Sequence, residues 1–163
     1  MNPETQNRSA EELLKSVSLF EKCSDEEIRK LVLGMRPQLF DKGETILFQG
    51  IISNQLFLVS AGSVSVFSRK EKITRFIASL ERGAYFGEIS LVKNCAATAT
   101  VKANVRETEV YTLDYDVIKE VLQSNPDVKA DLESKIIERN RYRLEAFQKQ
   151  GELVSPLAAP API

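Results

Sequence analysis

Apolar residues recur at helical spacing near the start of the chain. Capping boxes, formed by Ser9 with Glu12 and by Ser24 with Glu27, predict the first turns of two helices. In such a box the serine accepts a hydrogen bond from the amide three residues on, while the glutamate reaches back to the serine amide. Pro37 is expected to end the second helix, because the residue before a proline resists the helical conformation.

The spacing changes to that of strands between residues 38 and 113. Glycines and a charged cluster at residues 69–72 separate short apolar or alternating segments. These segments predict strands at residues 45–48, 56–59, 63–67, 73–80, 98–103 and 108–113. Residues 88–93 interrupt the series with apolar spacing that suits a short helix. Short strands at turn-spaced intervals are typical of a sandwich or barrel.

Helical spacing returns beyond the last of these strands. Asp114 or Asp116 can cap a helix that stops before Pro126, and a longer helix is predicted over residues 127–151. The apolar stripe of the longer helix consists of Val128, Leu132, Ile136, Ile137, Leu144 and Phe147. A homodimer through this helix is one expectation, and full use of the stripe against the strands is the other.

The order of these elements predicts an α+β fold. It is an antiparallel β-roll, jelly-roll-like and of about eight strands, with N-terminal helices, a short helix within the roll and two C-terminal helices. One domain is expected over residues 9–151, with the roll at about 38–113 and the C-terminal helices at about 115–150. The polar residues 1–8 are expected to be flexible, and the Pro/Ala-rich residues 152–163 to be disordered.

Composition narrows the classes of function. The 163 residues carry 22 basic and 23 acidic side chains, a balance that argues against a partner such as nucleic acid or an anionic membrane. The chain has no histidine, which removes Ser-His-Asp catalysis and histidine-ligated metals. Two cysteines suggest no disulfide framework, and the polar N-terminus lacks the apolar core of a signal peptide. We therefore expect a cytoplasmic binding module rather than an enzyme, with no metal site and no cofactor.

The stretch GAYFGEISLVKNCAATATVKA, residues 83–103, carries the most chemical information. Gly87 precedes a short helix whose first residues are Glu88, Ile89 and Ser90. Unpaired amides at a helix start, beside a glycine that permits close approach, can hold a phosphate, and Glu88 can accept hydrogen bonds from a sugar hydroxyl. The alternative from spacing alone is a connecting helix with a solvated glutamate.

FGEISL followed by ATATVKA resembles the phosphate-binding cassette of cyclic-nucleotide-binding domains. That family includes the regulatory subunits of cyclic-AMP-dependent kinase, cyclic-GMP-dependent kinase, cyclic-nucleotide-gated channels and the bacterial catabolite activator. FDKGETI at residues 40–46 and FLVSAGSV at residues 57–64 also resemble the family's glycine-punctuated roll. The resemblance runs from about Leu13 to Phe147 and implies the family's fold and its ligand, cAMP or cGMP.

The resemblance also implies roles for single residues. Glu88 would hold the ribose 2′-hydroxyl, and the amides of Gly87, Ile89 and Ser90 would bind the cyclic phosphate. Thr98 falls where cyclic-GMP-dependent kinases and several channels have a threonine that contacts the phosphate and the guanine edge. A buried threonine at the start of a strand is the alternative for Thr98.

Ala97 departs from the family pattern, because the arginine that pairs with the cyclic phosphate is expected at this position. A lost hydrogen bond to a charged group costs about 1.5–3 kcal/mol, roughly ten- to 150-fold in affinity. The helix amides remain, so weakened binding is expected on energetic grounds, although some family members without the arginine bind no nucleotide. Lys93 is a candidate substitute, but the outer turn of the short helix favours a solvated position for it.

The long C-terminal helix carries a second signal. Ile137-Glu138-Arg139 lies where hyperpolarisation-activated channels have a similar triplet whose arginine covers the purine. Arg139 would do so by hydrogen bonding or by stacking its guanidinium on the base. The alternative is a solvated face shared with Arg141 and Arg143. Leu80 and Val64 would line the interior of the roll.

Two functions remain on these grounds. The first is a sensor in which a cyclic nucleotide occupies the roll and the last helices close over it to control a separate effector protein. The second is a degenerate domain of the same fold, with weak or no nucleotide binding, that binds a partner protein. A transcription factor like the catabolite activator is not expected, because only about ten residues follow the long helix, too few for a helix-turn-helix.

Overall fold

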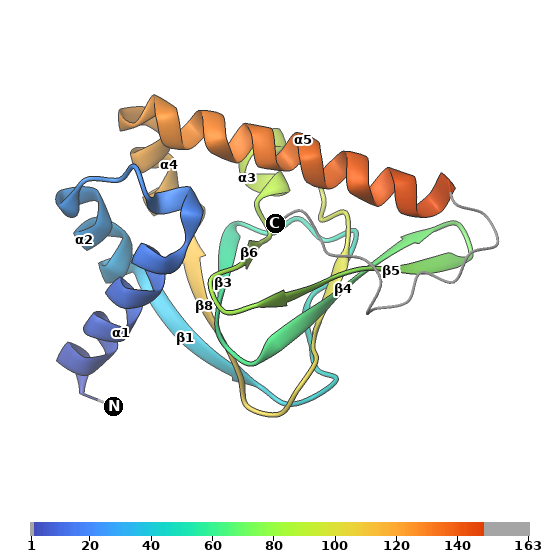
Figure 1. Cartoon of the computed structure of the whole chain (residues 1–163), viewed down its shortest axis with the longest axis horizontal. Coiled ribbons are helices and arrows are strands. Elements are labelled where there is room, and N and C mark those ends of the chain that lie inside the picture. The colour runs from blue at the N-terminus through green and yellow to red at the C-terminus, as the bar shows by residue number, and fades with distance from the viewer. Residues whose placement is uncertain (1, 149–163) are drawn as a thin grey trace.

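The computed structural model describes residues 2–148 and consists of a β-roll with helices at one end and across one side (Figure 1). Two four-stranded antiparallel sheets form the roll, with strand orders β1-β8-β3-β6 and β2-β7-β4-β5. The strands of the first sheet are β1 (Met35–Phe40), β3 (Gln55–Ala61), β6 (Tyr85–Phe86) and β8 (Thr108–Asp114). Those of the second are β2 (Thr45–Leu47), β4 (Ser63–Lys70), β5 (Ile73–Glu81) and β7 (Thr100–Ala103). Together with the helices, they confirm the predicted α+β roll of eight strands.

The N-terminal helix begins earlier than its sequence predicts. Helix α1 (Pro3–Ser16) is capped by Asn2, whose side chain accepts a hydrogen bond from the amide of Glu4 at 3.1 Å, so the predicted cap at Ser9 is wrong. Pro3 suits the first helical position because its missing N–H has no intrahelical partner there. The stretch expected to be flexible over residues 1–8 is therefore helical from Pro3 onward.

The second capping box is confirmed. The helix that follows it ends at Gly34, three residues before the proline that was expected to end it. A 3-10 turn, η1 (Ser18–Phe20), leads into α2 (Asp25–Gly34), where Ser24 and Glu27 make both reciprocal hydrogen bonds. The chain then passes at Met35 into β1, which contains Pro37 and starts the roll three residues before the predicted 38. β1 is an edge strand, where a proline with no N–H is tolerated.

Strand β3 lies between two apolar cores. Leu56 and Leu58 face a cluster shared with the helices, whereas Phe57 and Val59 face a second cluster inside the roll. Because alternate side chains of a strand point to opposite faces, a strand buried on both faces reads as an unbroken apolar run. The helical cluster therefore joins the helices to the same sheet that walls the roll interior.

The two C-terminal helices follow β8 directly. Helix α4 (Tyr115–Ser124) starts after Asp114, whose side chain makes no capping bond, and α5 (Pro126–Gln148) runs across the roll above β5 (Figure 1). The predicted last residues of α5, 149–151, and the tail at 152–163 lie outside the described residues. None of the described helices has the length and apolar character needed to cross a membrane.

The predicted apolar stripe of α5 is only partly correct. Val128, Leu132 and Ile136 are buried in the helical cluster, but Ile137 is 68% exposed and Leu144 is 43% exposed. Ile137 follows Ile136 directly, and neighbouring residues of a helix cannot share one face. The face of α5 above the roll carries instead the polar residues described below.

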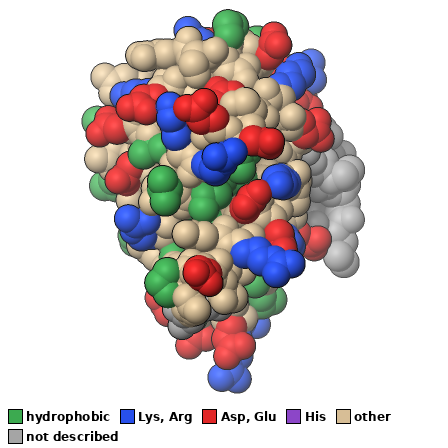
Figure 2. All heavy atoms as spheres, turned by 90° about the vertical axis from the view of Figure 1, so that its left-hand side faces the viewer, with side chains coloured by type: hydrophobic (Ala, Val, Ile, Leu, Met, Phe, Trp, Pro, Cys, Tyr) green, Lys and Arg blue, Asp and Glu red, His purple; other side chains and the backbone are tan. Residues whose placement is uncertain are grey.

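The helical end of the molecule is evenly charged at its surface. Figure 2 shows basic and acidic side chains interspersed there around small groups of hydrophobic ones.

Cys23, near this end, is a free thiol, and burial, followed by the charge of Glu27, raises its pKa to about 11. Cys95 is also a free thiol.

Replacing Leu132 by Ala is expected to lower the free energy of unfolding by about 2–5 kcal/mol, because a fully buried leucine that joins α5 to the other helices leaves a cavity. Ile137→Ala, on the exposed side of the same helix, is the matched control and is expected to change stability by less than about 0.5 kcal/mol. Urea denaturation followed by circular dichroism measures both. Equal losses in the two variants would show that α5 is not anchored as described.

Candidate functional site

Gly87 shapes the backbone that enters the short helix α3 (Ile89–Lys93). Its φ is +84°, a left-handed conformation that favours glycine, and an added Cβ would lie 2.9 Å from the ring of Phe57. That ring stacks on Phe86 with centroids 4.9 Å apart, so the space beside Gly87 is filled. The Tyr115 hydroxyl donates a hydrogen bond to the Gly87 carbonyl and fixes this turn to the start of α4.

The first turn of α3 lies beside the interior of the roll. Ile89 and Ser90 form its first turn, where the amide groups have no preceding helical carbonyls as partners. Gly87, Ile89 and Ser90 all line one cavity between the roll and α5. The residues whose amides are predicted to bind a phosphate therefore lie together at this cavity.

Glu88 forms a buried ion pair with the last helix. Its Oε1 accepts from Nη1 of Arg139 at 2.7 Å, and the two side chains are only 9% and 19% exposed. The Arg139 guanidinium also lies 4.6 Å from the centroid of the Tyr85 ring, in cation–π geometry. Its Nη2 is buried with no hydrogen-bond partner among residues 2–148. Arg139 is thus not on a solvated face, and one of its donors has no partner among residues 2–148.

Ala97 and Thr98 also line this cavity. The Ala97 amide donates to the Ile51 carbonyl at 2.9 Å, and the Ala97 carbonyl accepts from the amide of Gly50 at 2.8 Å. The Ser68 hydroxyl donates to the Thr98 carbonyl at 2.9 Å. These bonds hold the segment before β7 to the loop after β2 and to β4, so its backbone is firmly placed beside the cavity.

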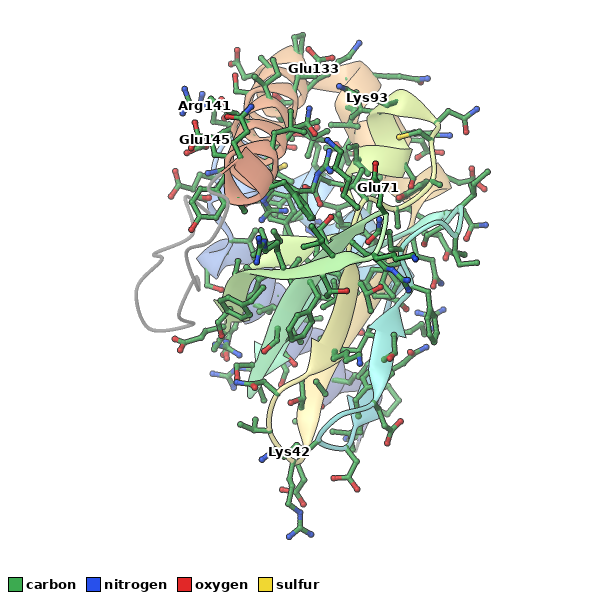
Figure 3. The ribbon with its side chains drawn as sticks, turned by 90° about the vertical axis from the view of Figure 1, so that its right-hand side faces the viewer. Lys42, Glu71, Lys93, Glu133, Arg141 and Glu145 are labelled. Atoms are coloured by element: carbon green, nitrogen blue, oxygen red, sulfur yellow. The ribbon has the colours of Figure 1, made fainter. Side chains whose placement is uncertain are left out.

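The structure brings all eight predicted site residues to the same cavity. These residues are Leu80, Gly87, Glu88, Ile89, Ser90, Ala97, Thr98 and Arg139. Val64 is fully buried in the roll cluster but does not line the cavity. Lys93 is exposed on the outer side of α3 (Figure 3), so it cannot take the place of the missing arginine at position 97.

Sequence reasoning missed part of the α5 wall and the strand before the cassette. Asn140, Tyr142 and Arg143 also line the cavity, and Tyr85 supports Arg139 from β6, which at two residues is too short to give an alternating pattern. The helical spacing of Arg139 and Arg143 was the available signal, because residues four apart share a face.

The cavity combines apolar walls with a few converging polar groups. Aliphatic surface comes from all four strands of the second sheet, through Leu47, Val66, Ile77, Leu80 and Val101. The polar side chains of the lining include Glu88, Arg139, Asn140 and Arg143. Such a site suits a ligand with an apolar ring, hydroxyl groups and one anionic group.

Comparison with known proteins identifies the family. The sequence profile of the cyclic nucleotide-binding domain matches residues 37–125, which is more than half of the chain. The chain belongs to the cyclic nucleotide-binding domain family. The matched part holds the roll, the cassette and α4, whereas Arg139 and the rest of α5 lie beyond it.

Relatives of this cyclic nucleotide-binding domain include much longer proteins. It is 33% identical over 129 residues to the rod photoreceptor subunit alpha of the cyclic nucleotide-gated channel of Gallus gallus, covering 76% of this chain and 20% of the channel subunit. It is 32% identical over 127 residues to the human cyclic nucleotide-gated channel alpha-3, covering 75% and 18%. The chain thus spans about a fifth of the length of these channel subunits.

Solved structures show the same fold. The regulatory domain of Toxoplasma gondii PKA, crystallised with cAMP, matches with a TM-score of 0.73 at 22% identity, over 81% of this chain and 51% of that one. At this identity the likeness concerns the fold. The cyclic nucleotide-binding domain described here therefore has the family's roll and helices, with alanine at position 97 of its cassette.

The Glu88–Arg139 pair is expected to couple α5 to the cassette in the free protein. In a double-mutant cycle with Glu88→Gln and Arg139→Gln, we expect a coupling free energy of about 1–3 kcal/mol, because each single change leaves a buried group without its partner. Chemical denaturation of the four proteins measures it. The exposed pair of Arg141 and Glu145, 4.0 Å apart on the same helix, is the matched control and is expected to show no measurable coupling. Equal coupling in the two cycles would contradict the buried contact.

Proposed function

We propose that this domain binds a cyclic nucleotide monophosphate, cAMP or cGMP, and reports its presence through the position of α5. The amides of Ile89 and Ser90 bind the cyclic phosphate, and Glu88 accepts hydrogen bonds from the ribose 2′-hydroxyl. The aliphatic walls take the purine. The observation that carries the proposal is the meeting of α3, Glu88 and Arg139 around one cavity, since it joins an amide site, a sugar acceptor and a lid.

Arg139 connects ligand binding to the position of the lid. Its Nη1 already pairs with Glu88, while the buried Nη2 is left for the purine or the ribose. A ligand that offers an acceptor to Nη2 binds better when α5 lies over the roll than when α5 is displaced. By linkage, the ligand then shifts the population toward the closed arrangement.

Position 97 sets the expected strength of binding. The side chain of Ala97 is 6% exposed and packs in the apolar cluster inside the roll, so the cassette itself supplies no cation. The amides and a short helix remain on that side. We therefore infer weaker binding than in a cassette with arginine at this position.

The same alanine favours a second candidate function. A cassette that packs an apolar side chain where the family places a cation, and whose Glu88 is already paired, suits a degenerate domain that binds a partner protein. In either case we expect no enzymatic activity of the domain itself, and the output passes to a separate effector protein. Dimerisation through α5 would use its exposed Ile137 and Leu144.

Calorimetric titration with cAMP and with cGMP separates the two functions. The wild-type domain is expected to bind at least one of them with a submillimolar dissociation constant. Ala97→Arg is expected to tighten binding by about tenfold or more, because the cassette gains a charge-assisted partner for the phosphate. Glu88→Ala is expected to weaken binding, because the ribose loses its acceptor.

Thermal unfolding of each variant serves as the control for folding. Binding by the Ala97→Arg variant alone would overturn the sensor function for this chain and would favour the degenerate domain.

A further inference from the structure

Arg143 is a second guanidinium in the cavity, one helical turn beyond Arg139. The two residues are four apart on α5 and share the face above the roll. Arg143 is half-buried there, and its Nη2 donates to Oδ1 of Asn140 at 2.6 Å. The bond to Asn140 holds the guanidinium beside the cavity rather than in solvent.

The charge of Arg143 is not balanced by a neighbouring carboxylate. Across residues 2–148, its polar contact is the neutral side chain of Asn140, and no ion pair is formed. Burial lowers the pKa of Arg143, which means that its charged form has lost solvation without gaining a counter-charge. A partly desolvated cation of this kind is stabilised by an anion that enters the cavity.

The charged residues of the cavity lining, taken together, also favour an anionic ligand. Among the described lining residues, the charged ones are Glu88, Arg139 and Arg143. Glu88 and Arg139 neutralise each other at 2.7 Å, which leaves the single positive charge of Arg143. A cyclic nucleotide monophosphate carries one negative charge, on its phosphodiester. The cavity lining thus carries one net positive charge, and the single negative charge of the ligand balances it.

We propose that Arg143, from the lid, supplies the cation for the cyclic phosphate that this cassette lacks at Ala97. The proposal rests on the proposed function and specifies how it is achieved. Arg143 and the wall formed by Ala97 and Thr98 line the same cavity, so the phosphate is held between the amides of α3 and a guanidinium of α5. Planar guanidinium groups bind phosphate oxygens through two parallel N–H donors, which suits this role.

The first test is calorimetric titration of wild type, Arg143→Gln and Arg143→Lys with cAMP, cGMP and cIMP. Arg143→Gln is expected to weaken binding about ten- to 150-fold, by a similar factor for all three purines, because the phosphate is common to them. Arg143→Lys retains the charge and is expected to recover part of the loss. Arg141→Gln removes an exposed arginine two residues away (Figure 3) and is expected to bind as wild type.

The second test is epistasis with position 97. In an Ala97→Arg background, Arg143→Gln is expected to cost less than about threefold, since the cassette then holds the phosphate itself. Additive losses in the two backgrounds would overturn the proposal. So would a loss that differs tenfold between purines, because it would place Arg143 at the base edge.

The same titrations also separate the role of Arg143 from the proposed sensor function on which it rests. Wild-type binding that is unchanged in a folded Arg143→Gln protein overturns the role of Arg143 and leaves the sensor function standing. Failure of the folded wild-type protein to bind any of the three nucleotides overturns both.

Discussion

The contact between Glu88 and Arg139 is the interaction on which the closed arrangement of this domain depends. It joins Glu88, which caps α3 at the edge of the roll, to the middle of α5. Both side chains are largely buried, so the pair is retained only while its two charges stay together. Displacing α5 leaves a carboxylate and a guanidinium to be solvated separately, and this is why the position of one helix and the state of one site are linked.

The two halves of α5 serve different purposes, and its sequence reflects this division. Before Ile136, the buried residues Val128 and Leu132 belong to the cluster that α5 shares with the other helices, and α5 packs there against α4 and η1. Beyond Ile136, the inward face carries Arg139, Asn140 and Arg143 above a cavity, and the apolar packing there is against the roll, by Tyr142 and Ala146. A helix that is anchored at one end and polar over a cavity can move about its anchored half at less cost than a helix packed along its whole length.

Much of this domain could be predicted from the chain, and the reasons for the exceptions are physical. The strands, the hairpin at residues 69–72 and the short helix follow from spacing and turn residues, because those signals are local. The start of α1 at Pro3 was not predicted, because residues 1–8 are polar and lack the apolar spacing of a helix, whereas Asn2 caps the helix there. All eight predicted site residues line one cavity. Arg143 lines it too but was not predicted, because the charged residues of this part of α5 face solvent and cavity in turn. Which arginine faces inward depends on the crossing of α5 over the roll, and no local pattern encodes that crossing.

The location of the cation matters for how strongly a ligand couples to the lid. A cassette arginine belongs to the roll, so it holds the phosphate whether the lid is open or closed, and its contribution favours neither state. A lid arginine contributes only when α5 lies over the cavity. Moving the cation from position 97 to position 143 therefore weakens binding to the open state while it keeps the contact in the closed state. Because a ligand shifts a conformational equilibrium only by its difference in affinity for the two states, a domain built this way gives up affinity but converts more of its binding energy into closure.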